Sequence, residues 1–124
     1  AIFDKIRLME IKIIKNSISR KELIDIASEE FGDVVKVVVD TEQEIMAVGG
    51  ELHADEESLL MEQRDSKRQY LWGINLYPKK TGEEGIEFDS MINIKPIYGN
   101  RSRGVGDEAV REKIKEIVRK LVVT

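Results

Sequence analysis

The chain has 124 residues, a formal net charge of −4, 41% hydrophobic and 35% charged residues, and no cysteine. This length is enough to bury one ordinary globular core. The acidic balance argues against a dedicated duplex-DNA binder, and the lack of cysteine excludes disulfides and thiolate metal sites and fits a reducing cytoplasm. No apolar run reaches the roughly 20 residues of a membrane span, so we expect a cytoplasmic protein without membrane insertion.

Capping signals and periodicity predict two helices. Ser19 and Glu22 form a capping box, in which the Ser19 hydroxyl bonds the Glu22 amide and the Glu22 carboxylate returns to Ser19. Gly32 ends this helix, where a left-handed backbone is favoured. Asp107 caps a second helix that runs to Leu121, with acidic residues early and basic residues late, as the helix dipole favours. Apolar residues recur at helical spacing in both helices: Leu23, Ala27 and Phe31 in the first; Val110, Ile114, Ile117, Val118 and Leu121 in the second.

The other apolar segments alternate with the period of strands. Strands are predicted over residues 9–14, 34–39, 44–48, 72–77 and 86–94. Segment 55–69 stays open between a short helix and a strand. We therefore predict an α+β fold. It is a single domain over residues 9–124, with a mainly antiparallel sheet of about five strands and two helices packed on one face.

Strict alternation also predicts the faces of the last two strands. If 72–77 and 86–94 pair antiparallel, one face is apolar and covered by helices, and the other is polar. The apolar set is Ile74, Leu76, Phe88, Ile92 and Ile94; the polar set is Asn75, Tyr77, Glu87, Asp89 and Asn93. We expect any ligand to lie over the polar face, between walls formed by residues 49–55 and 99–104.

Four blocks of unusual sequence stand out: MAVGGELHADEE from Met46, LWGINLYP from Leu71, EFDSMINIKP from Glu87 and GNRSR from Gly99. These blocks resemble a family of short prokaryotic proteins known only as a domain of unknown function. The likeness runs from about Met9 to Leu121, and it implies no activity, cofactor or catalytic residue. Members that resemble this chain begin near Met9, so we interpret residues 1–8 as an upstream start or a remnant of cloning.

The only histidine, His53, follows Gly49 and Gly50. An imidazole among carboxylates suits general acid–base chemistry. We predict His53 and Asp89 as the catalytic groups if the protein is an enzyme, which the sequence leaves open, as it does the cofactor. The alternative is a histidine that bonds a neighbouring carboxylate in an ordinary ion pair.

A loop rich in cations supplies the candidate ligand site. Arg presents a bidentate fork to phosphate or carboxylate, and the flanking glycines let the backbone approach a ligand. We predict that Arg101 and Arg103 bind an anion and that Asn100 and Asn93 orient it. Glu51 and Asp55 are assigned to the same pocket. The alternative is that the arginines pair with the acidic residues, which requires no ligand.

A metal site is a weaker interpretation. Carboxylates beside a histidine are hard ligands that suit Mg²⁺ or Mn²⁺. The candidates are Glu51, Asp55, Glu56, Glu87, Asp89 and His53. No spacing among them matches a known metal motif, so we assign no metal site.

The favoured function is a small cytoplasmic pocket protein that binds an anionic, phosphate- or nucleotide-like molecule. The alternative is a non-catalytic interaction module that forms a homodimer or binds a protein partner or single-stranded RNA. In the RNA version, Tyr98, the 100–103 loop and the Arg64, Lys67 and Arg68 turn would contact bases and phosphates.

Overall fold

The computed structural model describes residues 10–124 apart from the side chain of Glu83; the predicted extension, residues 1–8, lies outside the described residues. The helices are α2 (Arg20–Glu30), α3 (His53–Arg64) and α4 (Glu108–Leu121). The strands are β1 (Lys12–Ile14), β2 (Ile18–Ser19), β3 (Val35–Asp40), β4 (Ile45–Val48), β5 (Leu71–Leu76), β6 (Ile86–Glu87) and β7 (Val122–Val123). Short 3-10 turns are η1 (Arg68–Tyr70), η2 (Gly82–Gly85), η3 (Met91–Asn93) and η4 (Pro96–Tyr98).

Five strands form an antiparallel sheet in the order β1-β4-β3-β5-β6. The β-branched strand β3 lies at its centre, where Val38 is opposite both Ala47 of β4 and Gly73 of β5. A separate parallel pair, β2 and β7, brings Ile18 opposite Val122. This pair joins the start of α2 to the end of α4. The predicted α+β fold with a five-stranded antiparallel sheet is confirmed.

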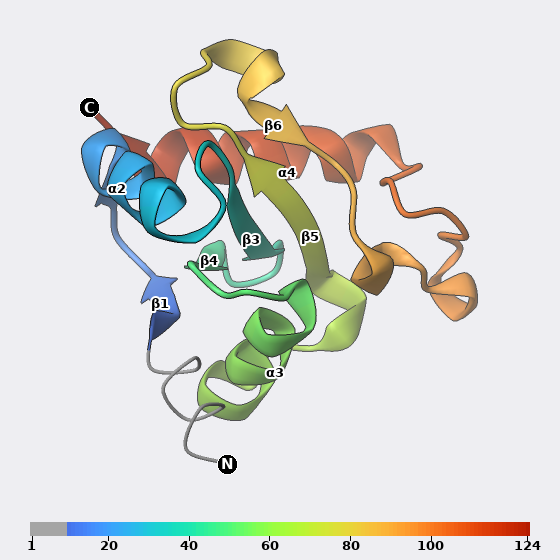
Figure 1. The fold of residues 1–124 in the computed structure, drawn as a ribbon. Coiled ribbons are helices and arrows are strands. Elements are labelled where there is room, and N and C mark those ends of the chain that lie inside the picture. The colour runs from blue at the N-terminus through green and yellow to red at the C-terminus, as the bar shows by residue number, and fades with distance from the viewer. Residues whose placement is uncertain (1–9) are drawn as a thin grey trace.

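Helices cover both faces of the sheet. α2 and α4 pack on one face, and α3 packs on the other (Figure 1). The first face packs Leu23, Val37, Ile74 and Ile114 in one buried cluster. The second face packs residues of α3 and the sheet in a smaller cluster that includes Leu60. The prediction of two helices on one face is confirmed. The ambiguous segment 55–69 is helical as far as Arg64, where α3 ends, and reaches β5 through the short turn η1.

The predicted helix caps are present, with one difference. Ser19 Oγ accepts a hydrogen bond from the Glu22 amide at 3.0 Å, and Asp107 Oδ1 accepts one from the Ala109 amide at 2.8 Å. The Glu22 carboxylate does not complete the capping box; it accepts from Lys12 Nζ at 2.6 Å. Gly32 adopts the expected left-handed backbone with φ +96°. The side chain of the preceding C-cap residue, Phe31, is 43% exposed and lies outside the core.

The predicted strand 86–94 is too long. Strands β5 and β6 do pair antiparallel, with Asn75 opposite Glu87. Phe88 packs, as expected, on the face that α2 and α4 cover. After Glu87 the chain leaves the sheet and turns through η3. Ile92 consequently packs against the α3 cluster instead of the predicted face, and Ile94 is 39% exposed. Strand alternation does not extend into a 3-10 turn, which has about three residues per turn.

Within residues 10–124, no helix is both long enough and apolar enough to span a membrane.

Candidate functional site

His53 is the first residue of α3 and lies against β5. Its Nε2 is 2.8 Å from the Ile74 carbonyl oxygen. A carbonyl only accepts, so Nε2 carries the proton, and Nδ1 holds the lone pair of the neutral ring. Burial lowers the pKa of His53, and this effect outweighs the bond to Ile74, which raises it. The imidazole is therefore neutral at neutral pH and only 8% exposed.

Asn93 and Asn100 bind the backbone of the protein itself. The Asn93 side chain accepts from the Gly73 amide at 2.8 Å and donates to the Gly73 carbonyl at 2.9 Å, so it extends β5 as a neighbouring strand would. Asn100 Nδ2 donates to the carbonyls of Asn93, Ser102 and Gly104, and its Oδ1 accepts from the Gly106 amide. Both side chains are buried. Their amides hold together the segment from residue 90 to residue 106.

The two predicted anion-binding arginines are exposed on this segment. Arg103 Nε donates to Asp89 Oδ1 at 2.6 Å, and this pair raises the pKa of Arg103. Asp89 and His53 are close enough for the Asp89 charge to raise the pKa of His53. The structure thus brings His53, Asp89 and Arg103 into one region. It also pairs Asp89 with Arg103 as the ion-pair alternative expects.

The acidic residues around His53 have different environments. Glu51 is exposed and Asp55 is half-buried. Glu56 is fully buried: its Oε2 accepts from the Gly50 amide at 2.9 Å, while burial raises its pKa well above that of an exposed glutamate. Among the side chains that the structure describes, no group of three or more His, Asp or Glu residues is placed to hold a metal ion.

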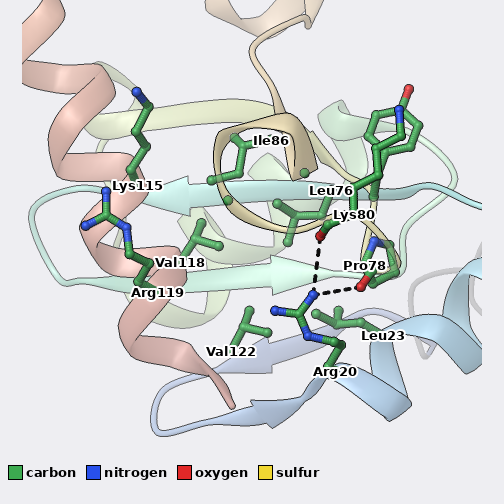
Figure 2. A pocket seen from close by; sticks show the side chains of 13 residues that line it. Arg20, Leu23, Leu76, Pro78, Lys80, Ile86, Lys115, Val118, Arg119 and Val122 are labelled. Carbon is green, nitrogen blue, oxygen red and sulfur yellow. Dashed lines mark hydrogen bonds between the residues drawn. The ribbon is translucent and has the colours of Figure 1, made fainter. Parts of the chain in front are cut away.

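A cavity that the sequence did not indicate lies on the other side of β5. It has a volume of about 490 Å³ and opens between the start of α2, the end of α4 and the chain from residue 76 to residue 86. Figure 2 shows its apolar floor and the cations that come from opposite sides of the opening. The floor is formed by Leu23, Leu76, Ile86, Val118 and Val122. We call this the basic cavity, because the described residues that line it include four cations, Arg20, Lys80, Lys115 and Arg119, and no acid.

The four cations are not equivalent. Arg20 Nη1 donates to the carbonyls of Pro78 at 2.9 Å and Lys80 at 3.3 Å, so it ties the 78–80 loop to α2 (Figure 2). Lys115 pairs with Glu112 at 3.2 Å. Lys80 is exposed, with Nζ 4.8 Å from the centre of the Tyr77 ring, and Arg119 is exposed on α4. Lys80 and Arg119 are therefore the two exposed cations of the lining.

Sequence reasoning missed all four of these residues. In the sequence, Lys115 and Arg119 are two basic residues one helical turn apart near a helix C-terminus, which the dipole alone explains. Arg20 and Lys80 belong to a helix start and a polar loop. No short-range pattern links residues so far apart in the chain, so no local signal could have identified them.

Fold and cavity together define a small α+β protein with a cationic concavity between two helices and a sheet edge. The chain belongs to the family described as "Protein of unknown function (DUF5674)", whose model matches residues 12–121. The resemblance to a family of unknown function is thereby confirmed. No curated protein and no solved structure matches the chain.

Proposed function

We propose that this protein binds a small anionic molecule with an apolar part in the basic cavity. The observation that carries the proposal is the cavity's lining, which combines four cations and no acid, among the described residues, with an apolar floor. The whole chain carries a net charge of −4, so the cavity is opposite in sign to the molecule. Its volume of about 490 Å³ is within the range of small-molecule sites.

The lining of the cavity would contact two different parts of the ligand. Lys80 and Arg119 would contact the anionic group at the mouth, where Arg offers a bidentate fork and Lys a mobile point charge. The apolar part would lie on Leu76 and Val118. Arg20 acts as a positioning residue, since two carbonyls of the 78–80 loop already accept from it.

The sequence-predicted loop is the second location for the same class of ligand. There, Arg101 and Arg103 would bind the anion while Asn93, Asn100, Glu51 and Asp55 line the pocket. The bonds of the two asparagines to the backbone, and of Arg103 to Asp89, favour the basic cavity instead. The acid–base role of His53 and Asp89 and the cytoplasmic location remain predictions.

A binding experiment separates the two locations. Anilinonaphthalene sulfonate, an amphipathic anion whose fluorescence rises in apolar sites, serves as the probe, and inorganic phosphate as the competitor. Two double variants each remove two positive charges: Lys80→Ala/Arg119→Ala at the cavity and Arg101→Ala/Arg103→Ala at the loop. We expect the cavity variant to weaken probe binding at least about tenfold, roughly 1.4 kcal/mol, while the loop variant binds as the wild type.

Each other outcome is informative. Weakening only in the loop variant would move the site to the sequence-predicted loop. Equal binding by the wild type and both variants would overturn the proposal. Thermal unfolding of each variant shows whether a loss of binding reflects a loss of folding.

A further inference from the structure

The segment from residue 91 to residue 98 exposes a row of large apolar side chains. Their exposed fractions are 64% for Met91, 39% for Ile94, 86% for Ile97 and 51% for Tyr98. All four lie on η3, η4 and the residues joining them. We call this row the 91–98 ridge. Single exposed apolar side chains are ordinary, whereas a cluster of this kind marks an interaction site.

The ridge is held rigidly although it lies at the surface. Lys95 and Asn100 exchange two backbone hydrogen bonds, at 2.7 and 3.2 Å, and Lys95 Nζ donates to the Ile92 carbonyl at 2.9 Å. The Asn93 side chain fastens one end to Gly73, and that of Asn100 fastens the other to Gly104 and Gly106. The segment that carries the four side chains is fixed by these hydrogen bonds. It therefore presents them in one arrangement, which lowers the entropy cost of binding a partner.

The segment that carries the ridge has a net positive charge. Residues 89–104 contain one acid, Asp89, and three bases, in a chain whose net charge is −4. Asp89 is already paired with Arg103, and Arg101 is exposed. Lys95 itself is buried, with Nζ 4.9 Å from the centre of the Trp72 ring. Two charges act on its pKa, that of Glu57, which raises it, and that of Arg68, which lowers it. Burial lowers the pKa of Lys95 to about 8, so its ammonium is still charged at neutral pH.

These features select one kind of occupant. Three of the four ridge side chains are aliphatic, which suits the apolar side chains of a protein, whereas single-stranded nucleic acid is bound by stacking on aromatic rings. A second copy that offers its basic cavity would bring two positive surfaces together, which is repulsive. We propose that the 91–98 ridge is a docking surface for a protein segment that carries apolar side chains and carboxylates.

A peptide-selection experiment tests the proposal. The probe is a phage-displayed library of random peptides. It is first depleted on the Ile97→Ser/Tyr98→Ser variant and then selected on the wild-type protein. We expect the enriched peptides to combine Leu, Ile or Phe with Asp or Glu. Synthetic versions should bind the wild type at least about tenfold more tightly than the Ile97→Ser/Tyr98→Ser and Arg101→Glu variants. The control, Phe31→Ser, removes an exposed apolar side chain at the end of α2 and should bind as the wild type.

Several outcomes would overturn the proposal. These are no enrichment on the wild type over the depleting variant, enriched peptides without acidic residues, or equal affinity for the ridge variants. Tighter binding of an oligouridine probe that depends on Ile97 and Tyr98 would assign the ridge to RNA. Concentration-dependent dimerisation abolished by Ile97→Ser/Tyr98→Ser would assign it to a second copy. Matching thermal unfolding midpoints establish that the variants are folded.

Discussion

At the scale of single residues, Gly73 decides how closely η3 approaches the sheet. A Cβ added to it would lie 2.5 Å from the Ser90 Cβ and 3.2 Å from His53 Cδ2. Both of these neighbours are buried, and Asn93 binds the amide and carbonyl of Gly73 itself. The glycine thus makes room for the turn that ends β6 and for the His53 ring.

We expect Gly73→Ala to lower the free energy of unfolding by about 1–3 kcal/mol, because the Ser90 backbone must shift to admit the methyl group. Urea denaturation measures this change. Ser90→Gly removes the Ser90 Cβ. In that background, Gly73→Ala should lower the free energy of unfolding by less than it does in the wild type. A Gly73→Ala protein as stable as the wild type would show that η3 is not packed this tightly.

Glu56 is a second residue with a consequence for stability. Burial raises its pKa, so the folded protein retains a proton that the unfolded chain releases. Its contribution to stability is therefore fully present below the pKa of an unfolded glutamate, about 4.3. It is lost as the pH rises through the raised pKa of the folded state.

We expect Glu56→Gln to stabilise the protein relative to the wild type progressively more as the pH rises from about 5 towards the raised pKa of Glu56. Glutamine keeps an acceptor for the Gly50 amide but cannot ionise. Urea denaturation across this range measures the difference, with the exposed Glu62→Gln on α3 as the control. A difference between Glu56→Gln and the wild type that does not change with pH would contradict the assigned buried proton.

At the scale of elements, the segment after β6 replaces a strand with side-chain hydrogen bonds. Asn93 takes the place of a paired backbone beside Gly73, and Asn100 holds three carbonyls and one amide of its own loop. This arrangement holds the ridge and the Arg101–Arg103 loop without regular secondary structure. It also offers a test of whether Asn100 serves the fold or a ligand.

We expect Asn100→Ala to cost about 2–4 kcal/mol, because several buried backbone groups lose their partners. Hydrogen exchange should increase at the Gly106 and Lys95 amides. Ser102→Ala, at an exposed position in the same loop, should change stability by no more than about 0.5 kcal/mol. If Asn100→Ala is as stable as the wild type, the amide is free to orient a ligand, as the sequence interpretation proposed.

At the scale of the whole molecule, the two cores share the strands of one sheet. Leu60 of α3 is buried on one face and Ile114 of α4 on the other. Because strands β3, β4 and β5 contribute side chains to both clusters, neither face can unfold without disturbing the other. The predicted single domain follows if this coupling is strong.

We expect Leu60→Ala and Ile114→Ala each to lower the free energy of unfolding by about 2–5 kcal/mol. In each variant, far-UV circular dichroism and the fluorescence of Trp72 should report one coincident transition. Trp72 packs in the same cluster as Ile114, on the face opposite Leu60. A shift of the Trp72 unfolding midpoint in Leu60→Ala therefore measures the coupling between the two faces. An early transition seen by circular dichroism alone would divide residues 10–124 into two folding units.

Features that depend on near neighbours in the chain could be predicted from the sequence. The Ser19 and Asp107 caps, the Gly32 helix end and the β-branched strand β3 follow from interactions within a few residues, and each is present. The same short-range reasoning extended the alternation of β6 beyond Glu87. It could not see that Asn93 would bond to Gly73, a residue of another strand.

The position of the basic cavity depends on the packing of elements that are distant in the chain. Arg20, Lys80 and Arg119 are far apart in the chain and line one cavity because α2 and α4 pack on the same face of the sheet, next to the 78–80 loop. A concavity is the space left between packed elements, so its position depends on how helices and strands are placed relative to one another. That placement comes from non-local burial of apolar surface, which no pattern among near neighbours records.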